Sequence, residues 1–134
     1  MSPYVDTIYI ANRSAARAEA AAAAITNARA LRWADLERGF GAADLIVQAT
    51  TLGMEGQVEP DWPMALCRAS AIVADIVYRP LETGLLRAAR ARGLVTLDGL
   101  GMLIHQGALA FELWFGVEPD VAGARVRLTA AITR

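Results

Sequence analysis

Short apolar segments alternate with helical segments along the chain, and this alternation constrains the fold more than any other feature. β-Branched and aromatic residues favour extended backbone. They predict strands at 7–11, 31–33, 45–48, 72–77 and 94–97. Helical composition predicts helices at 14–27, 83–92, 101–115 and 119–132, with one helical turn at 64–68. Strands that alternate with helices across short loops predict an α/β fold, with a parallel sheet covered by helices on both faces.

The size and charge of the chain limit its class. A length of 134 residues predicts one domain, 1–134, which is small for a complete dinucleotide-dependent enzyme. A net charge of −1 excludes general attraction to nucleic acid, and Arg, Asp or Glu interrupts every apolar run before it could span a membrane. We see no secretory signal, and a lone cysteine, Cys67, fits a reducing cytoplasm. We therefore expect a cytoplasmic protein, with Cys67 in the core and its oligomeric state left open.

All thirteen basic residues are arginine, so the chain contains no lysine. Arginine stays protonated near neutral pH and cannot exchange protons there. Chemistry that needs a lysine as acid or base therefore cannot be completed by this chain.

The expected architecture is Rossmann-like, but its usual beginning is missing. A dinucleotide-binding fold normally starts with a strand, a Gly-rich turn and a helix whose N-terminus holds the pyrophosphate. Only residues 1–6 precede the first expected strand, and they contain no glycine. We expect the first strand, the Gly-rich loop and the first helix to be lacking. The strands at 7–11 and 45–48 would then lose their shared neighbour. We expect them to pair directly, or another chain to fill the gap.

The first candidate site follows the first strand. It consists of Asn12, Arg13 and Ser14, with Arg17 one helical turn further on. Two guanidinium groups and a hydroxyl at a helix N-terminus suit a phosphate dianion, and arginine at this position accommodates the 2′-phosphate of NADP. A capped, solvated helix start, with Ser14 as N-cap, is the alternative.

Two further candidates follow later strands. Ala49, Thr50 and Gly53 would let a cofactor approach the backbone, although an ordinary strand-to-loop exit explains them too. Tyr78 would present a phenol at the carboxyl ends of the strands, where open α/β sheets bind ligands. A buried structural tyrosine is the alternative.

The segment 99–116 is the most specific. Two glycines open a long apolar helix in which Gln106 is an amide suited to a neutral polyol, or else a tolerated polar residue. His105 has no nearby His, Cys or carboxylate pair, so we predict no metal site and assign it a packing or capping role. The tryptophans Trp33, Trp62 and Trp114 are expected to pack.

Together these motifs resemble the C-terminal cofactor domain of shikimate dehydrogenase, an NADP-dependent oxidoreductase of aromatic amino-acid (chorismate) biosynthesis. The similarity covers 5–121 and rests on four segments in order: 12–17, 49–54, 75–83 and 99–116. The resemblance implies that Asn12, Arg13, Ser14 and Arg17 clamp the 2′-phosphate of NADP. It also implies that Ala49 and Thr50 contact the cofactor, that Ile76 and Gly99 line its nicotinamide end with Met102 nearby, and that Tyr78 and Gln106 touch shikimate. Gln48 departs from the usual asparagine.

The resemblance also implies absences. The family's catalytic Lys–Asp pair belongs to an N-terminal substrate domain that this sequence does not contain, so no catalytic residue is assigned here. The simplest interpretation is a truncated gene that encodes a fragment of an enzyme interconverting 3-dehydroshikimate and shikimate. We expect the isolated chain to bind NADP weakly and to be inactive. A quinate-preferring relative and a non-catalytic Rossmann-like module that binds a ligand or partner are the alternatives.

Overall fold

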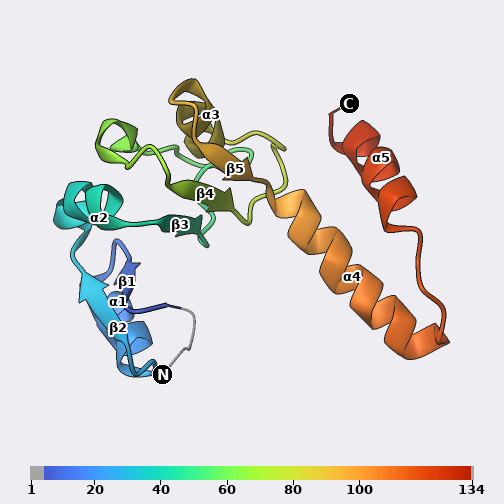
Figure 1. Ribbon diagram of the computed structural model, residues 1–134, viewed down its shortest axis with the longest axis horizontal. Coiled ribbons are helices and arrows are strands. Elements are labelled where there is room, and N and C mark those ends of the chain that lie inside the picture. The colour runs from blue at the N-terminus through green and yellow to red at the C-terminus, as the bar shows by residue number, and fades with distance from the viewer. Residues whose placement is uncertain (1–4, 134) are drawn as a thin grey trace. The chain divides into compact units, whose positions relative to one another are not determined.

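The computed structural model describes residues 5–133 (Figure 1). The chain divides into two units, 1–43 with 65–68, and 44–64 with 69–134, and each is described by itself. No helix among the described residues is long and apolar enough to cross a membrane.

The first unit is built on a parallel βαβ arrangement. Strands β1 (Ile8–Ala11) and β2 (Ala28–Leu31) pair in parallel, with Ile8 opposite Ala28 and Ala11 opposite Leu31. Helix α1 (Ala15–Ala23) joins the strands and contacts both. It buries Ala18 and Ala22, which lie on one face because they are four residues apart. After β2 come a 3₁₀ turn, η1 (Trp33–Asp35), and α2 (Leu36–Ala42), which buries Phe40.

Two predictions in this unit are wrong. Strand β2 lies at Ala28–Leu31 and not at 31–33, because pairing with β1 makes a strand of Ala-Arg-Ala, which carries no β-branched residue. Helix α1 ends at Ala23 and not near Asn27, because the amides of Ala24 and Ile25 turn back to the carbonyls of Ala21 and Ala22. Helix α2 was not predicted.

The second unit is built on a three-stranded parallel sheet. Its strands are β3 (Leu45–Gln48), β4 (Ile72–Asp75) and β5 (Val95–Leu97), in the order β3-β4-β5. Helix α3 (Gly84–Ala91) joins β4 to β5 and packs on both, burying Leu85, Leu86 and Ala89 completely. Between β3 and β4, a 3₁₀ turn, η2 (Met64–Leu66), falls within the predicted turn at 64–68; its residues 65 and 66 belong to the first unit. The predicted strand 72–77 ends at Asp75.

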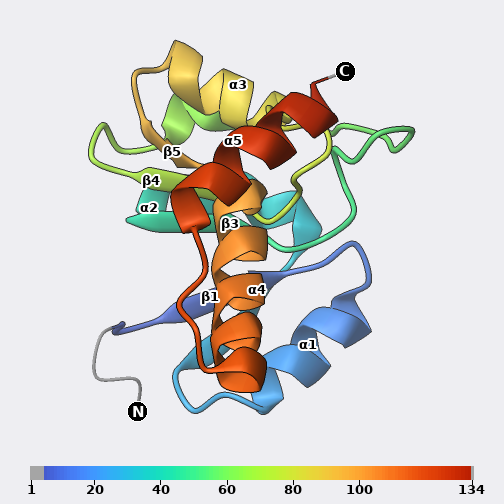
Figure 2. The same ribbon diagram turned by 90° about the vertical axis from the view of Figure 1, so that its right-hand side faces the viewer.

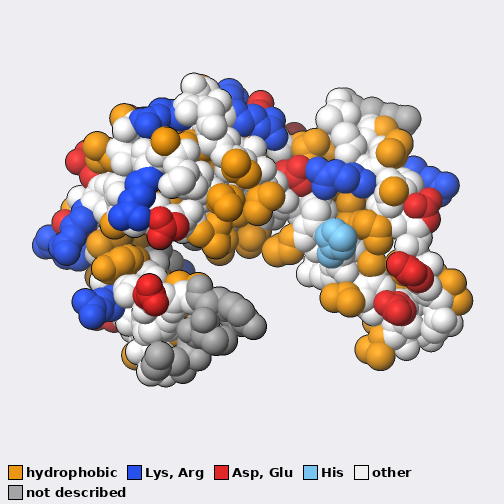
Figure 3. All heavy atoms as spheres, viewed as in Figure 1, with side chains coloured by type: hydrophobic (Ala, Val, Ile, Leu, Met, Phe, Trp, Pro, Cys, Tyr) orange, Lys and Arg blue, Asp and Glu red, His pale blue; other side chains and the backbone are white. Residues whose placement is uncertain are grey.

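The predicted α/β class with parallel strands is confirmed, but the prediction of one sheet covered by helices on both faces is wrong. The strands form two sheets: β1 pairs with β2, β3 pairs with β4, and none of the five described strands bonds to both β1 and β3. Direct pairing of β1 with β3 is therefore also wrong. In the second unit the face opposite Val73 carries side chains that are more than half exposed: Leu45, Val47, Val95 and Leu97. Figure 3 shows hydrophobic side chains gathered over this sheet.

Two helices complete the second unit. Helix α4 (Gly99–Phe115) begins directly after β5 and ends at Gly116, whose φ of 65° lies in the left-handed region that stops a helix. Helix α5 (Val121–Ile132) returns beside α4, as Figures 1 and 2 show. Both helices have an aspartate N-cap, Asp98 for α4 and Asp120 for α5.

Candidate functional site

The first predicted group stands where β1 passes into α1. The side chain of Asn12 closes this turn, because its Oδ1 accepts a hydrogen bond of 2.9 Å from the amide of Ser14. Ser14 occupies the N-cap position, but its hydroxyl makes no capping hydrogen bond. The predicted position of the cap is thus confirmed, while its expected side-chain bond is absent.

Arg13 and Arg17 present positive charge at the same helix start. Both side chains are exposed, and within residues 5–133 neither guanidinium takes part in an ion pair. Unpaired guanidinium groups beside an uncommitted hydroxyl form a donor set that fits a phosphate group.

In the second unit, the predicted residues follow three parallel strands at one sheet edge. Gln48 ends β3 and lies opposite Asp75, which ends β4, while Leu97 of β5 lies opposite Ala74. The residues after the strands therefore share the carboxyl edge. These are Ala49 and Thr50 after β3, Ile76 and Tyr78 after β4, and Gly99 after β5.

The buried side chain of Gln48 holds the turn that follows β3 at this edge, and we call its hydrogen bonds to this turn the brace. This side chain is only 6% exposed. The Oε1 atom accepts a hydrogen bond of 2.9 Å from the amide of Thr50, and the Nε2 group donates to the carbonyl of Leu52 at 2.8 Å. The departure from the family's usual asparagine thus has a structural role, which is to hold the turn 49–52 from within.

Asp75 fixes the next segment. Its carboxylate is buried and accepts hydrogen bonds from the amide of Val77 at 2.9 Å and from the hydroxyl of Thr83 at 2.8 Å. Burial raises the pKa of Asp75, although these two hydrogen bonds partly oppose the rise. Because Thr83 also accepts from the amide of Leu86, the end of β4 is tied to the start of α3.

Gly99 lies against the backbone that follows β4. A Cβ atom added at position 99 would lie 2.2 Å from the carbonyl oxygen of Ile76 and 2.7 Å from the carbonyl carbon of Val77. Only glycine allows α4 to start this close to the main chain. The structure therefore places Ile76 and Gly99, both predicted to line the nicotinamide end, in direct contact.

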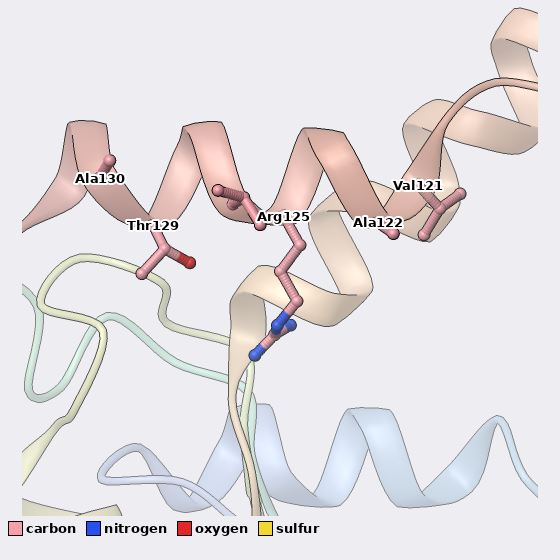
Figure 4. Close-up of a pocket in the computed structure, with 6 residues that line it drawn as sticks. Val121, Ala122, Arg125, Thr129 and Ala130 are labelled. Atoms are coloured by element: carbon pink, nitrogen blue, oxygen red, sulfur yellow. The ribbon is translucent and has the colours of Figure 1, made fainter.

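Asp98 holds the start of α4 to α5. Its Oδ1 accepts a hydrogen bond of 3.1 Å from the amide of Gly101, and its Oδ2 forms an ion pair of 2.5 Å with Arg125. Figure 4 shows Arg125 extending from α5 toward the start of α4. Burial alone would raise the pKa of Asp98, but the hydrogen bonds from Arg125 and Gly101 lower it. The hollow beside Arg125 is lined by α5 alone and contains no predicted site residue.

Gly99, Met102 and Gln106 share one face of α4, because they are three and four residues apart. The side chains of Met102 and Gln106 are exposed. The side chain of Tyr78 is 43% exposed, which excludes the alternative that it is a buried structural tyrosine. Residues 5–133 contain no cluster of three or more His, Cys, Asp or Glu that could hold a metal ion.

Of the remaining predictions, on the cysteine, the histidine and the tryptophans, some are confirmed and others are wrong. Cys67 is buried, as expected of a core residue, whereas His105 is exposed in the middle of α4, so its predicted packing or capping role is wrong. Trp33 and Trp62 are partly buried, but Trp114 is 74% exposed and does not pack within its unit.

The chain is similar in sequence to known proteins. Residues 99–125 match the family described as Shikimate 5'-dehydrogenase C-terminal domain. The chain is 50% identical over 126 residues to the shikimate dehydrogenase (NADP(+)) of Methylocella silvestris, covering 93% of this chain and 45% of that protein. The chain is thus a relative of the shikimate dehydrogenases.

Solved structures agree with this relationship. A shikimate 5-dehydrogenase from Thermus thermophilus, in complex with NADP(H) and shikimate, superposes with a TM-score of 0.73 at 39% identity, over 87% of this chain and 43% of that one. A quinate dehydrogenase from Corynebacterium glutamicum, in complex with NAD, superposes with a TM-score of 0.84 at 34% identity, over 95% and 47%. The chain therefore spans about half the length of the shikimate dehydrogenases it matches.

The sequence motifs did not reveal the structural role of Glu59. Its carboxylate accepts hydrogen bonds from the amides of Gly84 and Leu85, both at 3.0 Å, and from the indole of Trp62 at 2.8 Å. The loop that follows the turn 49–52 is thereby attached to the start of α3. Only Trp62 is near in sequence, and a glutamate three residues before a tryptophan is no specific signal.

Proposed function

We propose that this chain is the cofactor-binding part of an NADP-dependent oxidoreductase that interconverts 3-dehydroshikimate and shikimate. The observation that carries the proposal is 50% identity over 126 residues to a shikimate dehydrogenase (NADP(+)), combined with exposed guanidinium groups at the start of α1. When bound, NADP supplies or takes up the hydride.

The residues present suit this cofactor. Arg13 and Arg17, with Asn12 and Ser14, would hold the 2′-phosphate, because charge-assisted hydrogen bonds from guanidinium groups are strong and match phosphate geometry. At the sheet edge of the second unit, the contact between Gly99 and Ile76 removes the bulk of a side chain from the surface proposed for the nicotinamide. Ala49 and Thr50 would contact the cofactor from the neighbouring strand end, with Met102 nearby.

Two exposed groups would recognise the substrate. The phenol of Tyr78 can donate and accept a hydrogen bond, and so can the amide of Gln106. Such two-way hydrogen bonding suits the hydroxyl groups of a polyol. Quinate is a second candidate substrate, favoured by the similarity to the quinate dehydrogenase of Corynebacterium glutamicum.

The proposed choice of cofactor can be tested by titrating NADP⁺ and NAD⁺, up to millimolar concentration, into the ¹⁵N-labelled chain and following amide shifts. The wild-type chain should bind NADP⁺ more tightly than NAD⁺, with a dissociation constant weaker than micromolar. Arg13→Ala combined with Arg17→Ala should weaken NADP⁺ binding about tenfold or more, since hydrogen bonds to charged groups contribute about 1.5–3 kcal/mol. Binding of NAD⁺, which lacks the 2′-phosphate, should not change.

The matched control is Arg29→Ala combined with Arg38→Ala, which removes two exposed arginines from the same unit. Equal weakening of NADP⁺ binding by both double variants would reduce the effect to net charge and contradict the proposed clamp. A second assay follows NADP⁺ reduction in the presence of shikimate. The 134-residue chain should not exceed a blank without protein, because it contains no lysine for the Lys–Asp chemistry that the family resemblance implies.

A further inference from the structure

We propose that Gln48 is a positioning residue that shapes the turn 49–52 for the cofactor. This inference rests on the proposed function, since it assigns the turn to NADP. It adds a residue whose side chain touches no ligand itself and acts by fixing the backbone of those that do.

The side chain of Gln48 uses both ends of its amide inside the turn. The oxygen accepts from the amide of Thr50 at 2.9 Å, and the nitrogen donates to the carbonyl of Leu52 at 2.8 Å, with a longer contact of 3.4 Å to the carbonyl of Thr50. The hydroxyl of Thr50 then accepts from the amide of Leu52 at 3.2 Å. A carboxylate of the same shape could accept but not donate, and an apolar side chain could do neither.

The main chain of Gln48 reaches the neighbouring segment. Its carbonyl accepts a hydrogen bond of 3.1 Å from the amide of Ile76, immediately beyond the register pair formed by Gln48 and Asp75. One residue therefore connects the turn that carries Ala49 and Thr50 with the segment that carries Ile76 and Tyr78. Both segments contain residues proposed to contact cofactor or substrate.

The exposure of the turn indicates which side is available to a ligand. Gln48 and Leu52 are buried, whereas Ala49 is exposed and Thr50 half-buried. The brace thus occupies the inner side, while the outer side faces solvent at the carboxyl edge of a parallel sheet, where such sheets bind ligands. A turn held in one conformation before binding loses less conformational entropy when the ligand arrives.

The test compares Gln48→Glu, which keeps the shape but not the donor, with Gln48→Met, which is neutral and lacks both polar contacts. Gln57→Glu, at an exposed position in the following loop, controls for the added negative charge. One readout is hydrogen exchange at the amides of Thr50 and Leu52, which needs no ligand. The other is the dissociation constant of NADP⁺ from amide shifts, measured between pH 5 and pH 8.

Both Gln48 variants should exchange these two amides about fivefold to tenfold faster and bind NADP⁺ about tenfold more weakly at pH 7.5, whereas Gln57→Glu should match the wild type. As the pH falls, the carboxyl introduced by Gln48→Glu gains a proton and can donate to Leu52 again. Its binding deficit relative to the wild type should therefore shrink in acid, while that of Gln48→Met stays constant.

Faster exchange with unchanged NADP⁺ affinity would show that the brace is only structural and would overturn the inference. A binding deficit of Gln48→Glu that does not shrink in acid would also overturn it, because the donated hydrogen bond would then be irrelevant. Failure of the proposed function gives a different result, in which NADP⁺ shifts no amide of the wild-type chain and both proposals fall together.

Discussion

The carbonyl oxygen of Ile76 lies where a side chain at position 99 would begin, 2.2 Å from an ideal Cβ. The obstacle is main chain on both sides, the segment that follows β4 and the first turn of α4, so no side-chain rotation can relieve it. Because glycine has no Cβ atom, position 99 allows the helix that carries Met102 and Gln106 to start at this place.

Gly99→Ala should destabilise the protein by about 2–3 kcal/mol, because overpacking that moves backbone costs roughly this much. Gly107→Ala is the matched control, since it lies in the same helix and its Cβ would meet nothing within 4 Å. It should stabilise the helix by about 0.5–1 kcal/mol, because alanine has the higher helix propensity. Urea denaturation followed by circular dichroism measures both changes. Equal effects of the two substitutions would contradict the contact.

The contribution of Asp75 to the stability of the protein should fall as the pH rises through the mildly acidic range. Burial raises its folded pKa above the unfolded value, so the folded state binds the proton more tightly. The stabilising contribution is thus complete below the unfolded pKa of about 3.9 and is lost as the pH rises through the folded pKa. The difference in unfolding free energy between wild type and Asp75→Asn should decline over that window. A difference that is flat or that increases with pH would contradict the raised pKa.

The sequence predicted those parts of the fold that have a local cause. Strands β1 and β3 were found because β-branched residues favour extended backbone, and α3 was found within the predicted helix at 83–92. Strand β2 was misplaced because Ala28 to Ala30 have no strand propensity and are extended only through pairing with β1. That pairing joins residues twenty positions apart and leaves no local pattern.

The candidate site also contains some residues whose place could be predicted from the sequence and others whose role depends on the folded chain. The strand-end residues were predictable because parallel strands bring their carboxyl ends to one edge, and the register confirms that Ala49, Ile76 and Gly99 follow neighbouring strands. Gln48 was recognised as unusual, but its role depends on the path of the following turn. The contact between Glu59 and the start of α3 spans 25 residues and needs the folded loop to exist.

Asp98 should stabilise the start of α4 in two separable ways. Asp98→Ala removes both the N-cap and the partner of Arg125, and should cost about 1–2 kcal/mol. Asp98→Asn keeps a good N-cap and loses only the ion pair, so it should cost less than about 1 kcal/mol, since Arg125 is about half exposed. The lowered pKa of Asp98 means that its stabilisation is present above the unfolded pKa and is lost as the pH falls through the folded pKa. Urea denaturation at pH 7 and pH 3 should therefore show the gap between wild type and Asp98→Ala narrowing in acid.

Glu59 should anchor its loop through the start of α3. Glu59→Ala leaves the amides of Gly84 and Leu85 without their acceptor and removes a negative charge from a helix N-terminus, so we expect a loss of about 1–2 kcal/mol. The indole of Trp62 also loses its acceptor, so its fluorescence should change in the folded state.

Glu55→Ala is the matched control, because Glu55 belongs to the same loop and its ion pair with Arg79 is largely exposed on both sides. Such surface pairs contribute about 0–1 kcal/mol, and this substitution should leave the Trp62 signal unchanged. Urea denaturation and tryptophan emission of the two variants decide the matter. If Glu55→Ala destabilises the protein as much as Glu59→Ala, the loop is held by its overall charge and not by the three hydrogen bonds to Glu59.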